Sequence, residues 1–194
     1  MMLLKNLEKY NIILASDSLR RQELLKELGL KFKVISSQSE ESFPEALGMT
    51  AIPEYLAGLK ANAVKNKMPE NYLLITADTI VWEYGKVIGK PVDREDAIAI
   101  LESLSGSQHQ VITGMCIKTA EKEVSFHAVT EVWFDELTKE EIVYYVDKYK
   151  PYDKAGAYGI QEWIGFIGIM KIEGSFYNVM GLPVHKLYQN LKKF

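Results

Sequence analysis

The feature that most constrains the fold lies near the start of the chain. The apolar run Ile12-Ile13-Leu14 predicts a buried strand, and residues 18–28 predict a helix that begins at Ser18 and ends before Gly29. Arg20 and Arg21 therefore lie in the first turn of the helix, where a cation opposes the helix dipole at a cost of roughly a few tenths of a kcal/mol. A polyphosphate bound at this turn would explain the pair, and a solvated pair of arginines is the alternative.

Composition bounds the class of protein. The chain has 194 residues, of which 47% are hydrophobic and 25% are charged, so a globular protein is expected. The net charge of −3 argues against a general nucleic-acid binder, although a local cluster of basic residues can still bind an anionic substrate. Cys116 is the only cysteine, which excludes an intrachain disulfide and fits a reducing compartment. No segment predicts a secretion signal or a membrane span, so we expect a cytoplasmic protein.

Strand patterns and helix patterns alternate along the chain, which predicts an α/β fold. The predicted strands cover residues 12–15, 31–35, 72–77, 80–82, 87–88, 110–118, 124–134 and a segment around 165–172. The predicted helices cover residues 18–28, 53–65, 93–104, 138–149 and a closing segment from residue 185. Neither a linker nor a repeat interrupts residues 1–194. We therefore expect one domain with two lobes around a curved mixed sheet flanked by helices, and a central cleft where the loop after the first strand meets Asp78.

Two charged residues stand in apolar surroundings. Asp78 follows an apolar strand, where a carboxylate can bind a metal or orient a water, although an aspartate that only forms a turn is equally expected. Lys60 has apolar neighbours on its side of the predicted helix, which places its ammonium toward the core. A buried lysine needs an anion, and the alternative is that its long side chain reaches the surface.

Three further segments carry polar residues of interest. Glu40 and Glu41 lie in a polar loop and would matter only if a divalent metal is required. Lys90 lies between a glycine and a proline, a weak signal for a ligand loop. In the Gly-rich stretch 151–161, Asp153 and Lys154 predict a surface ion pair, and Gln161 offers the donor and the acceptor needed to contact a nucleobase edge. The three histidines have no metal-site spacing.

Taken in order, these segments resemble the Maf family of nucleoside triphosphate pyrophosphatases over residues 14–183. The motifs that carry the resemblance are LASDSLRRQELL, SEES, LAGLKA, ADT, GKP, LSGSQHQVITG, PYDKAGAYGIQ and EGSFYNVMGLP. The resemblance implies a two-lobed fold related to inosine triphosphate pyrophosphatases. It also implies hydrolysis of a nucleoside triphosphate between its α and β phosphates. One departure is Leu19, where the family usually has proline, and we expect activity to survive it.

The resemblance also implies roles for single residues. Asp78 is expected to be the proton acceptor or a carboxylate that binds a divalent metal, Mg²⁺ or Mn²⁺, with Glu41 as the second metal ligand and Lys90 as a further catalytic residue. The residues expected on the triphosphate are Ser16, Arg20, Arg21, Lys60 and Lys90.

Substrate choice within the family is implied by the segment 153–161. Asp153, Lys154 and Gln161 resemble the branch that acts on dTTP and UTP, and Arg20 and Thr79 also match positions that set the choice of base there. The alternatives are a broader pyrophosphatase, the branch that acts on 7-methyl-GTP, and a nucleotide-binding regulator of cell division or septum formation with little turnover. A homodimer is the family expectation, with neither nucleic acid nor membrane as a partner.

Overall fold

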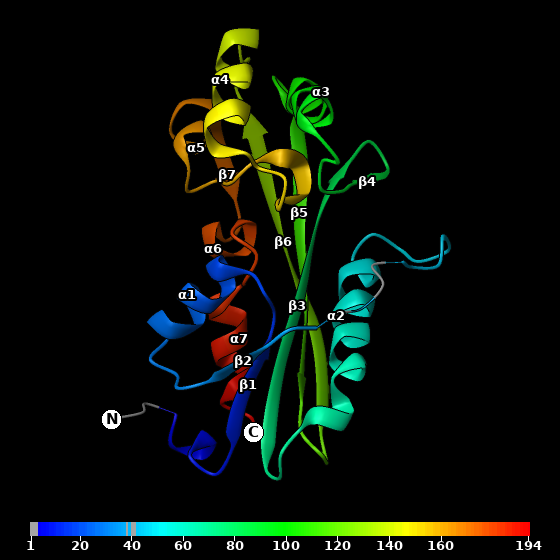
Figure 1. Ribbon diagram of the computed structural model, residues 1–194, viewed down its shortest axis with the longest axis vertical. Coiled ribbons are helices and arrows are strands. Elements are labelled where there is room, and N and C mark those ends of the chain that lie inside the picture. Colours follow the sequence, from blue (N-terminus) through cyan, green and yellow to red (C-terminus); the bar gives the residue numbers. More distant parts are fainter. Residues whose placement is uncertain (1–3, 38, 40–41) are drawn as a thin grey trace. The chain divides into compact units, whose positions relative to one another are not determined.

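The computed structural model describes residues 4–37, 39 and 42–194 (Figure 1). Within these residues, seven strands form one mixed sheet in the order β2-β1-β3-β5-β6-β7, and β4 pairs with β3. The strands are β1 (Asn11–Ala15), β2 (Lys33–Ile35), β3 (Tyr72–Glu83), β4 (Lys86–Ile88), β5 (Gln108–Lys118), β6 (Glu123–Phe134) and β7 (Ile169–Glu173). The predicted α/β fold with a mixed sheet flanked by helices is confirmed.

The helices begin largely where the sequence places their caps. The side chains of Ser18, Asp93 and Thr138 each accept a hydrogen bond from a backbone N–H of the first turn that follows, and Thr138 forms a complete capping box with Glu141. The α-helices are α1 (Leu19–Glu27), α2 (Ala51–Ala63), α3 (Arg94–Leu104), α4 (Lys139–Tyr149), α5 (Trp163–Gly168), α6 (Phe176–Val179) and α7 (Val184–Leu191). The 3₁₀ helices are η1 (Lys5–Leu7), η2 (Lys65–Lys67) and η3 (Ala155–Ala157). None of the helices in the described part of the chain has both the length and the apolar character to cross a membrane.

The chain divides into two compact units. Unit 1 comprises the described residues within 1–78, 113–128 and 181–194, and unit 2 comprises residues 79–112 and 129–180. Strands β3, β5 and β6 contribute residues to both units. The prediction of one domain with a central cleft stays a prediction.

Unit 1 is built around β1, which pairs in parallel with β2 on one side and with β3 on the other. Alternate residues of a strand point to opposite faces of the sheet. On one face, Ile13 and Leu74 pack with Ala57 and Ala61 of α2 and with the buried thiol of Cys116. Helices α1 and α7 lie on the other side of these strands from α2 (Figure 1).

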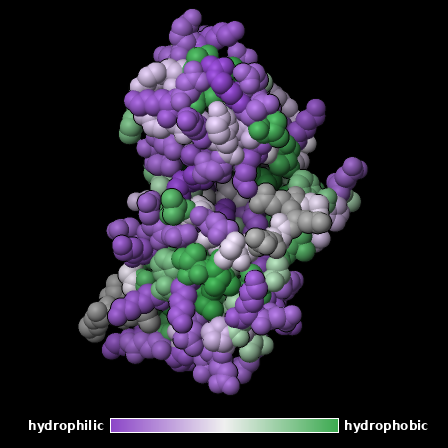
Figure 2. All heavy atoms as spheres, viewed as in Figure 1, coloured by the Kyte–Doolittle hydropathy of each residue, from purple (hydrophilic) through white to green (hydrophobic). Residues whose placement is uncertain are grey.

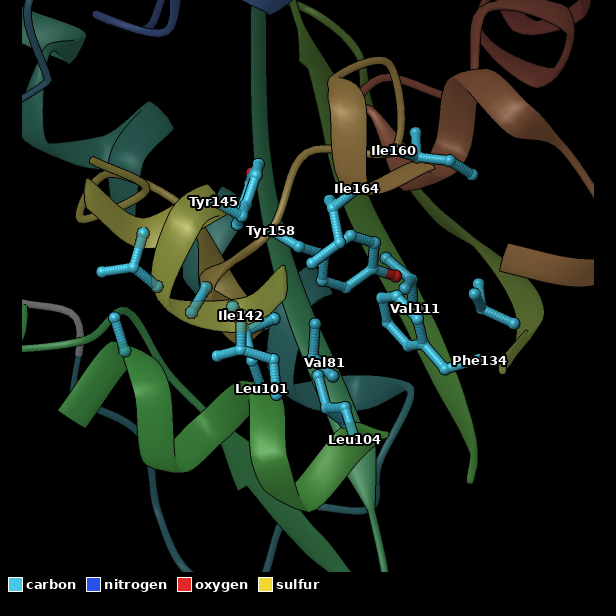
Figure 3. Packing of buried hydrophobic residues seen from close by; sticks show 14 residues of the cluster. Val81, Leu101, Leu104, Val111, Phe134, Ile142, Tyr145, Tyr158, Ile160 and Ile164 are labelled. Atoms are coloured by element: carbon cyan, nitrogen blue, oxygen red, sulfur yellow. The ribbon is translucent and has the colours of Figure 1, made fainter. Parts of the chain in front are cut away.

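Unit 2 has its own core, formed where α3, α4 and the segment 157–164 cover the sheet (Figure 3). Tyr158 packs edge-on against Phe134, with ring centroids 5.0 Å apart. Leu101 and Ile142, from α3 and α4, belong to the same buried cluster. The outer surface over α3 and α4 is mainly hydrophilic (Figure 2), as expected for helices with one apolar face.

Most predicted bounds lie within about two residues of the observed ones, and two predicted segments differ more. Strand β3 does not end at residue 77 but continues through Asp78 to Glu83, because residues 81–83 pair with β4 across a tight turn at Tyr84 and Gly85. The pairing of β3 with β4 outweighs the preference of Asp78 and Thr79 for a turn. The predicted strand around residues 165–172 is a helix up to Gly168 and a strand only from Ile169. An apolar run of this length does not distinguish helix from strand.

Candidate active site

The loop after β1 is held by hydrogen bonds within the loop and to residues of neighbouring segments. Ser16 is buried, and its hydroxyl accepts a hydrogen bond of 3.3 Å from the backbone N–H of Ser18. The Gln22 side chain donates to the Ser16 carbonyl at 3.2 Å, and the Ser36 hydroxyl donates to the Asp17 carboxylate at 2.7 Å. These bonds fix the backbone that leads into α1, so the first turn of α1 has a defined position in unit 1.

The two predicted phosphate arginines have different surroundings. Arg20 is half-buried in the first turn of α1. Arg21 donates from Nε to the carbonyl of Gly181 at 2.8 Å and from Nη1 to the carbonyl of Ala77 at 2.9 Å. Its guanidinium therefore joins α1 to the residue before Asp78 and to the segment before α7. This contact is a feature that the sequence did not predict.

Lys60 and Asp78 form a buried ion pair. Lys60 Nζ of α2 donates to Asp78 Oδ1 of β3, and each side chain is 10% exposed. The prediction that Lys60 is buried and needs an anion is confirmed, and an acidic side chain supplies it. Removing either member of such a pair would leave a charge in a poorly solvated place.

A second contact sets the position of α2 on β3. The Thr76 hydroxyl donates to the Ala57 carbonyl at 2.7 Å. Thr76 and Asp78 lie two residues apart on one face of β3, and Ala57 and Lys60 lie three apart on one face of α2. The Thr76 hydrogen bond therefore fixes the register in which Lys60 meets Asp78.

In unit 2, the loop that carries Lys90 is tied to the segment that carries Lys154. The backbone N–H of Gly156 donates to the Gly89 carbonyl at 3.0 Å. Gly156 has a positive φ of 72°, and a Cβ there would approach Val81 to 2.8 Å, so a residue without a side chain is required. Lys90 itself is exposed.

Lys154 is not the surface residue that the sequence predicts. Its ammonium is buried and lies 2.8 Å from Asp153 Oδ1 and 3.2 Å from Glu162 Oε1. Glu162 also accepts a hydrogen bond from the Tyr145 hydroxyl, and that hydroxyl accepts one of 3.0 Å from the Gly159 N–H. Burial and the Glu162 carboxylate raise the pKa of Tyr145, which keeps its proton in place for donation. Neither Glu162 nor Tyr145 was predicted as a site residue.

Gln161 and Thr79 are both half-buried in unit 2. The side-chain carbonyl oxygen of Gln161 is buried and has no hydrogen-bond partner among the residues that the structure describes. A buried acceptor of this kind is unusual and suits a donor from a ligand. Asp153 is exposed and contacts Lys154.

Of the two predicted metal ligands, the structure describes Asp78. Glu41 lies outside the described residues, and so does Glu40. Among the residues described, no three His, Cys, Asp or Glu side chains gather in a way that could hold a metal ion. Mg²⁺ is usually held by one or two carboxylates together with substrate phosphates, so the hard oxygen donors of Asp78 fit one ligand of such a site.

The three histidines have structural or surface positions, and His185 of α7 is exposed. His109 is buried in the core of unit 2, where Nε2 lies 2.8 Å from the Tyr158 hydroxyl and the ring stacks on Phe134. Burial lowers the pKa of His109 to about 4. In unit 1, His127 pairs with Glu54. Neither contact involves a predicted site residue.

Comparison with known proteins places the chain in a family. The family model described as Maf-like protein matches residues 11–194. A relative from Parabacteroides distasonis, named dTTP/UTP pyrophosphatase, is 57% identical over 99% of this chain and its own full length. One from Bacteroides thetaiotaomicron with the same name is 57% identical over 98% of this chain and its own full length.

A solved structure from Mycobacterium abscessus, described as a nucleoside-triphosphatase / dITP/XTP pyrophosphatase, aligns with a TM-score of 0.42. It is 16% identical and covers 66% of this chain and 75% of its own. The family model and the two relatives together match nearly the whole of the present sequence. The chain therefore belongs to the Maf family.

Proposed function

We propose that this protein hydrolyses dTTP and UTP to the nucleoside monophosphate and pyrophosphate. The observation that carries the proposal is the name dTTP/UTP pyrophosphatase on relatives that are 57% identical over nearly the whole chain. At that identity and coverage, a shared reaction is the expected outcome. The buried carboxylate of Asp78, paired with Lys60, supplies a group able to orient a water for attack on a phosphoanhydride.

Within unit 1 we assign the phosphate chemistry. Asp78 orients the attacking water and accepts its proton, and Lys60 holds the carboxylate in place through Oδ1. Ser16, Arg20 and Arg21 bind phosphate oxygens near the first turn of α1, where the helix dipole also favours anions. Lys90, which belongs to unit 2, is assigned to the negative charge that develops on the leaving pyrophosphate.

A divalent cation, Mg²⁺ or Mn²⁺, is part of the proposal. Asp78 would be one of its ligands and Glu41 the other. When bound, such a cation supplies positive charge that stabilises the phosphates and favours deprotonation of a water. The work of the protein residues is to hold the carboxylate, the phosphates and the water in fixed positions.

Within unit 2 we assign the recognition of the base. The buried, unpartnered carbonyl oxygen of Gln161 among the described residues supports this assignment. Uracil and thymine carry a ring N–H donor at N3, where cytosine carries an acceptor, and an acceptor on the protein would distinguish them. Thr79, Asp153 and Lys154 are assigned to the same task.

The proposal is tested by pyrophosphate release from dTTP, UTP, CTP, GTP and 7-methyl-GTP, with Mg²⁺ or Mn²⁺ and with a chelator. We expect turnover of dTTP and UTP that requires the metal, and a loss of at least about a hundredfold in Asp78→Asn. Asp147→Asn is the matched control, because Asp147 also pairs with a cation, Arg94, but on the surface of unit 2. Its activity should equal that of the unchanged protein.

Three other outcomes would change the conclusion. Preferential turnover of 7-methyl-GTP would move the protein to the other branch of the family. Binding of dTTP without any turnover would favour a nucleotide-binding regulator of cell division or septum formation. An Asp78→Asn rate within about tenfold of the unchanged rate would remove Asp78 from the chemical step.

We also propose a homodimer located in the cytoplasm. Sedimentation velocity of the purified protein tests the first point, since a monomer at micromolar concentration would contradict it. Cell fractionation tests the second.

A further inference from the structure

A buried series of contacts in unit 2 joins helix α4 to the segment that carries Lys154 and Gln161. The Gly159 N–H donates to the Tyr145 hydroxyl at 3.0 Å, and the same hydroxyl donates to Glu162 Oε2. Glu162 Oε1 lies 3.2 Å from Lys154 Nζ. One carboxylate thus binds the tyrosine with one oxygen and the lysine with the other.

The residues packed around Tyr145 and Glu162 leave little space for these two side chains to take other positions. Tyr145 is completely buried and lies in the hydrophobic core shown in Figure 3. A Cβ on Gly159 would lie 2.8 Å from the carboxyl carbon of Glu162, so a larger residue would displace that carboxylate. The Glu162 N–H donates to the Gly159 carbonyl at 2.9 Å, which closes a tight turn around Ile160 and Gln161.

The two carboxylates that contact Lys154 differ in exposure. The Asp153 side chain is 63% exposed, whereas that of Glu162 is 19% exposed. Exposed ion pairs hold a side chain weakly because water and salt screen them. Glu162 is the partner that fixes the position of the buried Lys154 ammonium, and Tyr145 fixes Glu162.

Lys154 lies between two carboxylates, and this bears on what it can bind. Its positive charge is already matched, so it adds little attraction for a further anion such as a triphosphate. An ammonium held in place can still donate a hydrogen bond to a neutral acceptor. This favours contact with the uncharged part of a nucleotide, the base or the sugar, and Gln161 immediately precedes Glu162.

We propose that Glu162, anchored by Tyr145, is a positioning residue that holds Lys154 and Gln161 for recognition of the nucleoside part of the substrate. This inference rests on the proposed function. Neither Glu162 nor Tyr145 needs to touch the substrate. Their effect is transmitted through the fixed ammonium of Lys154 and through the turn that contains Gln161.

The test uses two variants that remove different parts of the arrangement. Tyr145→Phe removes the hydroxyl that anchors Glu162, and Glu162→Gln keeps an acceptor for Tyr145 but removes the charge that faces Lys154. Tyr144→Phe is the matched control, since it makes the same change on α4 where the hydroxyl contacts Lys148 at the surface. Steady-state kinetics with dTTP, UTP and CTP and the melting temperature are measured for each.

We expect Tyr145→Phe and Glu162→Gln to raise KM for dTTP about five- to tenfold while kcat changes less than about twofold, the loss expected for a single binding contact. The preference for dTTP over CTP, taken as a ratio of kcat/KM, should fall in both. Tyr144→Phe should change neither quantity. A lowered melting temperature with unchanged KM and unchanged preference would show that the contacts are only structural, and would overturn the proposal.

A double-variant cycle distinguishes positioning from an independent effect. If Glu162 and Tyr145 act through Lys154 and Gln161, adding Tyr145→Phe to a variant that carries both Lys154→Met and Gln161→Ala should raise KM by less than about twofold further. Effects that multiply would overturn the proposal. If the unchanged protein fails to turn over dTTP and UTP, the proposed function fails by itself. The same cycle measured as dTTP affinity by calorimetry then decides the positioning role.

Discussion

The guanidinium of Arg21 donates a hydrogen bond of 2.9 Å to the carbonyl oxygen of Ala77, the residue immediately before Asp78. A second bond, to the Gly181 carbonyl, holds the same guanidinium from another side. Arg21 therefore contributes to the position of Asp78 through the backbone of β3, in addition to any contact with phosphate.

Replacing Arg21 with lysine should reveal this contribution. A lysine keeps the positive charge but lacks the rigid planar fork that reaches two carbonyls at once. We expect Arg21→Lys to lower kcat/KM for dTTP by about ten- to a hundredfold, because small displacements of a catalytic group are costly. Arg94→Lys changes a surface arginine paired with Asp147 and should leave kcat/KM unchanged. Equal activity of Arg21→Lys and the unchanged protein would contradict the role.

The Lys60–Asp78 pair predicts a coupled effect on stability. Lys60→Met and Asp78→Asn should each lower the free energy of unfolding by about 3–5 kcal/mol, because each leaves a buried polar partner behind. The double variant should lose clearly less than the sum of the two. Urea denaturation of the three variants measures this difference. Additive losses would mean that the pair contributes nothing as a pair.

The close contact of Gly114 in β5 with α2 predicts that adding a single methyl group there lowers the free energy of unfolding strongly. A Cβ at Gly114 would lie 2.2 Å from backbone atoms of Pro53 and Glu54. Gly114→Ala should therefore lower the free energy of unfolding by at least about 1–3 kcal/mol, since backbone cannot move aside cheaply. Gly58, in the middle of α2, has open space around its Cβ position, so Gly58→Ala should raise stability by about 0.5–1 kcal/mol. The same sign for both variants would contradict this account.

His109 predicts how stability depends on pH. Burial lowers the pKa of His109 to about 4 in the folded protein, against an ordinary value of 6.5. Between these values the unfolded chain takes up a proton that the folded protein does not, so stability falls as the pH falls from 6.5 to 4. The total contribution is roughly 3 kcal/mol.

The matched variant for this effect is His109→Gln, which does not titrate but can still bond the Tyr158 hydroxyl. Its free energy of unfolding should decline less steeply than that of the unchanged protein over that pH window. Urea midpoints at pH 7, 6, 5 and 4 measure the slopes. Parallel slopes would show that His109 takes up its proton equally in both states.

Features of the fold that depend on residues close together in the sequence could be predicted. Ser18, Asp93 and Thr138 cap their helices because a cap bonds to the turn that directly follows it. The burial of Lys60 followed from the apolar residues on its side of the helix. The strand at residues 80–82 and its partner at 87–88 were predicted as well, but the continuity of β3 through Asp78 was not, because pairing with β4 outweighs a local preference for a turn.

Contacts between segments far apart in the sequence could not be predicted from local sequence patterns. Nothing near Glu162 in the sequence indicates that it binds a tyrosine 17 residues earlier. The carbonyl partners of Arg21 are likewise 56 and 160 residues away. Helix α5 was missed because a short apolar run does not distinguish helix from strand. The partners of Glu162 and Arg21 can be identified only in the folded structure.

Because the Thr76 hydroxyl is bonded to Ala57 of α2, the number of residues between Thr76 and Asp78 matters more for the position of the carboxylate than the identity of the residues in β3. Side chains alternate along β3, so inserting or deleting a single residue between Thr76 and Asp78 would turn the carboxylate to the opposite face, away from Lys60. Apolar residues earlier in β3 can exchange for others of similar size at modest cost. The position of the Asp78 carboxylate therefore depends little on which apolar residues form the strand before it, and strongly on the number of residues that separate it from Thr76.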